Sequence, residues 1–346
     1  MLINYIQQKN PNFQEIEKIL QPAIQSNIWS NNGQIKQELE NHLHKLLNLP
    51  KEKCVVCTNS GTSSLQLLIM YYEYTCNRKL KWASSSYTFP SAVINNLDNV
   101  KLFDIDLDTF TIPLDSIIED YDGFIITNLF GTYPPNIQDW INYCRENGKI
   151  LIFDNASSPL STFDGKNICE LGDSCIGSLH CTKYLGGASE GGFIVIDKDK
   201  YDIINSLTNF GFNNSRKYNK YSSNYKMSEI NAAVHLYHLK NYDVEKHIYN
   251  QGTLIEEIDQ LEGVKVFNYN TGVILGNLPL LFDKIIDNRD FTDLGIMAHK
   301  YYLPLNENHK NSNELYKHIL NLPLHAGLTN FQIEFIIKQI KRKANE

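Results

Sequence analysis

From residue 53 onwards, short apolar runs alternate with stretches whose apolar residues recur at helical spacing. Short apolar runs bounded by turn residues are typical of buried strands. We expect strands over 54–58, 81–84, 100–104, 124–128, 150–154 and 193–196, and helices over 62–74, 89–96, 137–147 and 200–210. Alternation of this kind predicts an α/β fold in which helices cover both faces of a mostly parallel sheet.

The two ends of the chain differ from this central part. Helical periodicity over 12–25 and 34–47, separated by an Asn32-Gly33 turn, predicts two N-terminal helices. A long helical segment over 228–259 leads to a smaller region with strands over 264–267 and 272–275 and a helix over 331–341. We therefore predict a large domain, 1–260, and a small C-terminal α+β domain, 261–346.

Composition excludes several classes of protein. The net charge of −7 over 346 residues argues against nucleic acid as the main partner. We expect no membrane association, because no apolar run reaches the length of a membrane span and no signal peptide begins the chain. The seven cysteines are scattered, and Cys54 and Cys57 flank valines in a predicted strand, so packing is a better interpretation than zinc binding. A reducing cytoplasm fits this pattern.

The segment over 177–192 places Lys183 among small and hydroxylated residues, before a glycine-rich turn. Most lysines lie on solvated surfaces. Here Ser178, His180 and Thr182 alternate ahead of the lysine as on a short strand, and the glycines that follow permit close approach of a ligand. A desolvated lysine has a lowered pKa and can form a Schiff base.

Two further segments offer groups for a ligand. Ser60-Gly61-Thr62 joins the first strand to a helix, where free backbone amides can bind a phosphate, although a simple helix cap is an alternative. Asp154 ends a strand, where open α/β sheets bind ligands, and it could hold a protonated ring nitrogen or cap the next turn. Asp104, Asp106 and Asp108 are interpreted as a solvated turn, and no metal site is predicted.

In chain order the sequence offers a phosphate turn, an aromatic segment at Tyr87-Thr88-Phe89, a strand-end acid and a lysine. Pyridoxal 5′-phosphate (PLP) requires these four groups, for its phosphate, its ring face, its pyridinium nitrogen and its aldehyde.

With these residues in place, the chain resembles the DegT/StrS family of sugar aminotransferases, which are fold-type I PLP enzymes. The resemblance covers nearly the whole chain. The matching segments are Ser60-Gly61-Thr62, Tyr87-Thr88-Phe89, Leu129-Phe130-Gly131, Asp154-Asn155-Ala156, Ser178-Leu179-His180-Cys181-Thr182-Lys183, Glu190-Gly191-Gly192, Asn224-Tyr225-Lys226-Met227 and Leu322-Pro323-Leu324-His325.

The resemblance implies a role for each residue around the cofactor ring. Lys183 would form the Schiff base with PLP and later shuttle protons, and Asp154 would pair with the ring nitrogen. Phe89 and Ala156 would lie against the two ring faces. Ser157 stands where the family commonly has Gln or His near the phenolic oxygen.

The same resemblance implies a phosphate site made by Gly61, Thr62 and Ser178. An asparagine of the neighbouring subunit, here Asn224, would complete this site, which implies a homodimer. Lys226 replaces the usual arginine beside it and lacks the planar guanidinium. Asn128 replaces a frequent histidine.

The implied reaction is a ping-pong transamination in which L-glutamate converts PLP to pyridoxamine phosphate, and a nucleotide-linked keto sugar then accepts the amine. Tyr87, Glu190 and His325 would contact substrate. Family frequency favours a nucleoside-diphospho-4-keto-6-deoxyhexose, giving a 4-amino-4,6-dideoxyhexose, with a 3-keto sugar as the alternative.

Two other functional classes are less compatible with the sequence. The pyridoxamine-dependent dehydratases of the family carry histidine in place of the lysine, and Lys183 argues against them. A non-catalytic regulator would be expected to lose the lysine or the aspartate, and both are present.

Overall fold

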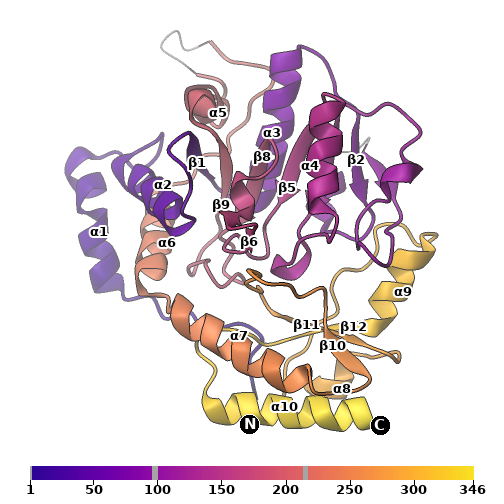
Figure 1. Ribbon diagram of the computed structural model, residues 1–346. Helices are drawn as coiled ribbons and strands as arrows, with labels where there is room; N and C mark the ends of the chain where they lie inside the picture. Colours follow the sequence, from indigo (N-terminus) through magenta and orange to yellow (C-terminus); the bar gives the residue numbers. More distant parts are fainter. Residues whose placement is uncertain (1, 96–99, 213–216) are drawn as a thin grey trace.

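The computed structural model describes residues 2–95, 100–212 and 217–346. At its centre lies a seven-stranded sheet in the order β1-β9-β8-β5-β4-β2-β3 (Figure 1). The strands are β1 (Lys53–Thr58), β2 (Trp82–Ser85), β3 (Lys101–Phe103), β4 (Gly123–Thr127), β5 (Ile150–Asp154), β8 (Ser174–Ser178) and β9 (Gly192–Asp197). The strands from β8 to β3 run parallel, and β9 is antiparallel to both of its neighbours. The predicted α/β fold with a mostly parallel sheet is confirmed.

Helices cover both faces of this sheet because successive residues of its strands point to opposite sides. On one face, Ile152 of β5 packs in a cluster with apolar residues of α3 (Gly61–Cys76). On the other face, Leu151 and Phe153 join the cluster that contains Trp140 of α4 (Ile137–Glu146). The shorter α5 (Tyr201–Leu207) packs beside α3.

The N-terminal helices α1 (Phe13–Ser26) and α2 (Gln34–Leu46) confirm the two predicted at this end of the chain, and both pack against α6 (Glu229–Asn241). The single long helix predicted over 228–259 is wrong. Tyr242 is extended, and the Asp243 carboxylate accepts a hydrogen bond from Lys246 N at 2.8 Å. This cap begins a second helix, α7 (Val244–Ile258).

The C-terminal region contains a small antiparallel sheet of β10 (Val264–Val266), β11 (Leu278–Phe282) and β12 (Ile319–Leu322). Its helices are α8 (Arg289–Thr292), α9 (Lys310–His318) and α10 (Asn330–Asn345), and α10 lies beside α7 (Figure 1). The strand predicted over 272–275 is wrong, because the Gln251 side chain bonds the backbone of Val273 and Leu275 there. The division at residue 260 stays a prediction.

Two shorter expectations also change. The helix predicted over 89–96 is a 3-10 turn at Pro90–Val93, and Asn96 lies outside the described residues. Asp104 is not in a solvated turn, because its carboxylate accepts hydrogen bonds from the backbone N–H groups of Asn311 and Ser312 in the first turn of α9. In the described part of the chain, no helix is both long and apolar enough to cross a membrane.

The N-terminal segment reaches the C-terminal region. Ile3 N donates to Gly295 O at 2.7 Å, and Met297 N donates to Ile3 O at 3.0 Å. The chain then runs from this pairing past the carboxyl ends of the central strands before α1 begins. Residues from both ends of the sequence therefore surround one edge of the sheet.

Candidate active site

A cavity of about 450 Å³ lies at the carboxyl ends of the parallel strands. Thr127, Asp154 and Ser178, each the last residue of its strand, line it together with Ser60 after β1. This is the edge at which open α/β sheets bind ligands. Of the predicted site residues, the cavity brings together Gly61, Thr62, Phe89, Asp154, Ala156, Ser157, Ser178, Lys183, Glu190 and His325.

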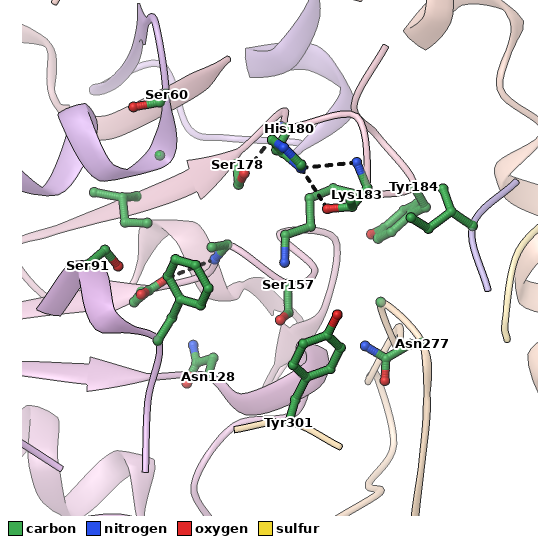
Figure 2. A pocket seen from close by; sticks show the side chains of 18 of the residues that line it. Ser60, Ser91, Asn128, Ser157, Ser178, His180, Lys183, Tyr184, Asn277 and Tyr301 are labelled. Carbon is green, nitrogen blue, oxygen red and sulfur yellow. Dashed lines mark hydrogen bonds between the residues drawn. The ribbon is translucent and has the colours of Figure 1, made fainter. Parts of the chain in front are cut away.

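Lys183 is carried by a tight turn after β8. Lys183 N donates to His180 O at 2.8 Å, and Gly186 N donates to Lys183 O at 3.0 Å. The strand expected to continue through His180 and Thr182 is therefore wrong: β8 ends at Ser178, and the chain turns. Figure 2 shows the Lys183 side chain pointing into the cavity towards Ser157, with Tyr301 and Asn277 on the opposite side.

The electrostatic setting of this lysine fits a nucleophilic amine. Burial lowers the pKa of the Lys183 ammonium, and the negative charge of Asp154 partly opposes this shift. A lowered pKa increases the fraction of free amine, which is the form that attacks a carbonyl.

Asp154 places a buried carboxylate in the cavity lining, and the residue is 3 % exposed. Ala156 N donates to Asp154 Oδ1 at 3.0 Å. Burial raises the pKa of the carboxyl, while the Ala156 hydrogen bond and Lys183 lower it. No described lysine, arginine or histidine forms an ion pair with Asp154. A buried carboxylate of this kind is stabilised by a cation that enters the cavity, such as a protonated ring nitrogen.

The predicted phosphate turn lies at the start of α3. Ser60 Oγ accepts a hydrogen bond from Ser63 N at 3.1 Å, so the helix-cap alternative holds for this side chain. Gly61 and Thr62 follow as the first helical residues and line the cavity. Backbone N–H groups in a first helical turn have no partner within the helix, so this end can bind a phosphate.

The turn Ser60-Gly61-Thr62 lies so close to the sheet that only glycine fits at the contact. A Cβ atom on Gly192 would lie 2.4 Å from Gly61 N and 2.4 Å from the Ser60 carbonyl carbon. A Cβ on Gly61 would lie 3.3 Å from Ser178 Cβ. The phosphate turn, β8 and β9 are therefore pressed together, and their spacing depends on these glycines.

We expect Gly192→Ala to destabilise the protein by about 1–3 kcal/mol, because the new methyl group forces the phosphate turn away from β9. The affinity for PLP should fall as well. Chemical unfolding measures the stability, and equilibrium dialysis measures the affinity for PLP. The matched control is Gly252→Ala in α7, where a Cβ would meet nothing within 4 Å. That change should stabilise the protein by about 0.5–1 kcal/mol and leave PLP affinity unchanged. Equal effects of the two substitutions would contradict the prediction.

Aromatic rings form one side of the cavity. Phe89 is 53 % exposed and lies edge-on to Tyr302, with their ring centroids 6.4 Å apart. Tyr302 stacks on Phe130, and its hydroxyl lies 3.2 Å from Ser157 Oγ. An exposed phenyl ring at the mouth of a cavity, with Ala156 also in its lining, leaves space for a flat ring.

Three predicted substrate residues have different positions. Glu190 lies at the cavity, where its Oε1 is 3.1 Å from His180 Nε2. His325 also lines the cavity, with Nε2 3.2 Å from Asn4 O, and burial lowers its pKa. Tyr87 is fully buried, and its hydroxyl donates to Tyr301 O at 2.6 Å. The contact of Tyr87 with substrate stays a prediction, and here its side chain is buried and outside the cavity lining.

Asn224 is exposed and is not among the described residues that line the cavity of its own chain. Lys226 Nζ donates to its Oδ1 at 2.6 Å and to Asn209 Oδ1 at 2.7 Å. Lys226 therefore fixes the orientation of the Asn224 amide on the molecular surface, although it lacks the guanidinium expected there.

Sequence reasoning missed one wall of the cavity, made of residues far apart in the chain. They are Tyr5, Gln7, Lys9, Asn277, Tyr301 and Tyr302. None belongs to a motif with a chemical signature, and no periodicity singles them out. Only the fold brings them to the edge of the sheet.

Comparison with known proteins is consistent with this geometry. The model of the DegT/DnrJ/EryC1/StrS aminotransferase family matches residues 12–272. The chain is 24 % identical to the dTDP-4-amino-4,6-dideoxy-D-glucose transaminase of Shigella dysenteriae, over 97 % of this chain and 98 % of that protein.

Solved structures show the same fold. DesI, crystallised with its TDP-sugar product, superposes with a TM-score of 0.84 at 22 % identity, covering 100 % of this chain and 93 % of that one. The PLP form of the putative sugar aminotransferase Spr1654 from Streptococcus pneumoniae gives a TM-score of 0.83 at 18 % identity, covering 100 % and 99 %.

Proposed function

We propose that this chain, which belongs to the DegT/DnrJ/EryC1/StrS aminotransferase family, uses PLP to move an amino group from L-glutamate to a nucleotide-linked keto sugar. The observation that carries this proposal is the meeting of Lys183 and Asp154 in one cavity beside a phosphate-binding helix end. An amine nucleophile, a buried carboxylate and a free set of amides match the aldehyde, the ring nitrogen and the phosphate of PLP.

When bound, PLP supplies an aldehyde that takes up amines and a ring that withdraws electrons. In this proposal the chain does the rest. Asp154 keeps the ring nitrogen protonated, and Gly61, Thr62 and Ser178 hold the phosphate. Lys183 Nζ would take the proton from the carbon that bears the donor nitrogen and would deliver it to the carbon on the other side of that nitrogen, a 1,3-transfer, since its lowered pKa suits it to both steps.

The proposed acceptor is a nucleoside-diphospho-4-keto-6-deoxyhexose, which would become a 4-amino-4,6-dideoxyhexose. The similarity to the Shigella dysenteriae transaminase supports amination at carbon 4. Incubation with L-glutamate and a panel of 3-keto and 4-keto nucleotide sugars, followed by mass spectrometry, tests this directly. An aminated 4-keto sugar is the expected product. A panel without any aminated sugar would overturn the proposed function, and amination of the 3-keto sugars alone would overturn the position.

We also propose that two subunits share each phosphate site, with Asn224 of one chain completing the site of the other. Its exposure outside its own cavity and its orientation by Lys226 support this. We expect Lys183→Ala and Asn224→Ala each to be impaired alone, and activity to return when the two are unfolded and refolded together. Each hybrid dimer then holds one site with both Lys183 and Asn224.

The matched control is refolding of Lys183→Ala with Lys183→Ala, which should stay inactive. Native mass spectrometry should confirm that hybrid dimers form. If the mixed sample is then no more active than the two variants refolded separately, Asn224 acts in the site of its own chain, and the proposal of a shared site is wrong.

A further inference from the structure

The N-terminal segment contributes Tyr5, Gln7 and Lys9 to the lining of the cavity. Four lining side chains, two of them from this segment, have a buried polar atom that no described group satisfies: Tyr5 Oη, Gln7 Oε1, Asn277 Oδ1 and His325 Nδ1. Buried polar atoms are nearly always hydrogen-bonded, so atoms like these on a cavity wall indicate a polar ligand.

Lys9 carries the charge of this wall. Its Nζ donates to Lys183 O at 3.1 Å and lies 3.5 Å from Tyr184 O. It also lies 3.3 Å from His238 Nε2, but that nitrogen is 2.7 Å from Tyr184 O. Burial lowers the pKa of His238 to about 4, so the ring is neutral. Its Nε2 proton therefore serves Tyr184 O, and His238 offers Lys9 no acceptor there.

An ammonium group has three N–H donors. Lys9 Nζ donates to Lys183 O and, at the longer distance of 3.5 Å, to Tyr184 O, which leaves one N–H without an acceptor among the described residues. Within the described part of the chain, no carboxylate lies within 4.0 Å of Lys9 Nζ. Burial lowers the Lys9 pKa to about 8, so the group is still largely charged at neutral pH. A half-buried cation without an anionic partner destabilises the protein, and a bound ligand with a negative charge would remove this cost.

The position of this cation selects one kind of ligand. Among the described cavity residues, Lys9 and Lys183 are the ones that carry an ammonium group, and none carries a guanidinium. Lys183 is committed to the cofactor, and Lys9 bonds the backbone carbonyl of that same residue. An α-carboxylate is attached to the carbon that bears the reacting nitrogen. The anomeric diphosphate of a hexose is attached several carbons away from the amination position.

We propose that Lys9 binds the α-carboxylate of the amino-acid donor. This inference rests on the proposed function and adds a donor site on the N-terminal segment. The free N–H of Lys9 can form a charge-assisted hydrogen bond to a carboxylate oxygen. Tyr5, Gln7 and Asn277 offer the donor further polar contacts on the same wall.

The test is the first half-reaction of the holoenzyme, followed by stopped-flow absorbance with three donors of similar shape. L-glutamate carries both carboxylates, L-glutamine lacks the distal one, and L-isoglutamine has an amide in place of the α-carboxylate. Lys9→Gln should raise the apparent Kd for glutamate and for glutamine by about 10–100-fold. It should not change the apparent Kd for isoglutamine. Lys9→Arg should recover part of the affinity, because it keeps the charge.

The matched control is Lys18→Gln, an exposed lysine of α1, which should leave all three constants unchanged. An equal loss for all three donors, or a fall in PLP content, would show that Lys9 only positions the Lys183 turn and would overturn the proposal. A loss of affinity confined to glutamate and isoglutamine, which carry the distal carboxylate, would also overturn the proposal. A loss seen only with the nucleotide sugar would assign Lys9 to the diphosphate instead.

Failure of the proposed function gives a different result. Wild-type holoenzyme would then show no spectral change with any amino donor. A wild type that reacts, together with an unaltered Lys9→Gln variant, refutes the donor site alone.

Discussion

Lys183→Ala is expected to lower turnover by about 10⁴-fold, the largest effect of any single substitution in this protein. The variant lacks the amine that both attaches the cofactor and moves the proton, so it loses two functions at once. Steady-state amination of the acceptor sugar measures the rate. Borohydride treatment followed by peptide mass spectrometry locates the cofactor, and the variant should yield no PLP-modified peptide.

The control for this experiment is Lys198→Ala, which changes an exposed lysine that follows β9 and lies outside the cavity. It should keep both the rate and the modified peptide. If borohydride still fixes the cofactor to a Lys183→Ala protein that turns over normally, another amine is the nucleophile.

Asp154→Asn is expected to lower kcat by about 10²–10³-fold, because a neutral amide cannot stabilise positive charge on a ring nitrogen. The free energy of unfolding of the cofactor-free protein should not fall. Burial already raises the pKa of this carboxyl, and an amide of the same shape costs less free energy to bury. Loss of rate without loss of stability therefore distinguishes an electrostatic role from a structural one.

Asp197→Asn provides the comparison, since this carboxylate also ends a strand but is partly exposed and pairs with Lys53 and Lys200. Surface ion pairs contribute little, so we expect its kcat to match the wild type and its stability to change by less than about 1 kcal/mol. Similar losses of kcat in both variants would mean that Asp154 has no special place in the reaction.

The parts of the site that could be predicted from sequence are those whose chemistry is local. Asp154 follows an apolar strand, and Ser60-Gly61-Thr62 joins a strand to a helix. In each case the flanking residues in sequence predict where the group lies, at the end of a strand. The order of the strands then brings these groups to one edge of the sheet. The apolar runs of β4, β5 and β9 were equally readable, because a strand buried on both faces needs a continuous apolar sequence.

The substrate wall could not be predicted in this way. Lys9 lies 174 residues from Lys183 in sequence, and their contact depends on how the N-terminal segment pairs near Ile296. No residue around Lys9 has a pattern that indicates a buried charge. Tyr87 shows the converse, since a residue in a matching motif can be buried outside the cavity lining.

The distribution of the cavity over the sequence also sets the order in which its two halves are synthesised. The groups that one chain lends to its own cofactor site, from Gly61 to Lys183, all precede β9 in the sequence. The opposite wall needs both the first nine residues and His325 near the end of the chain. The ribosome therefore synthesises a chain's own cofactor groups well before it reaches His325, and the substrate wall is the last part of the cavity to receive all of its residues.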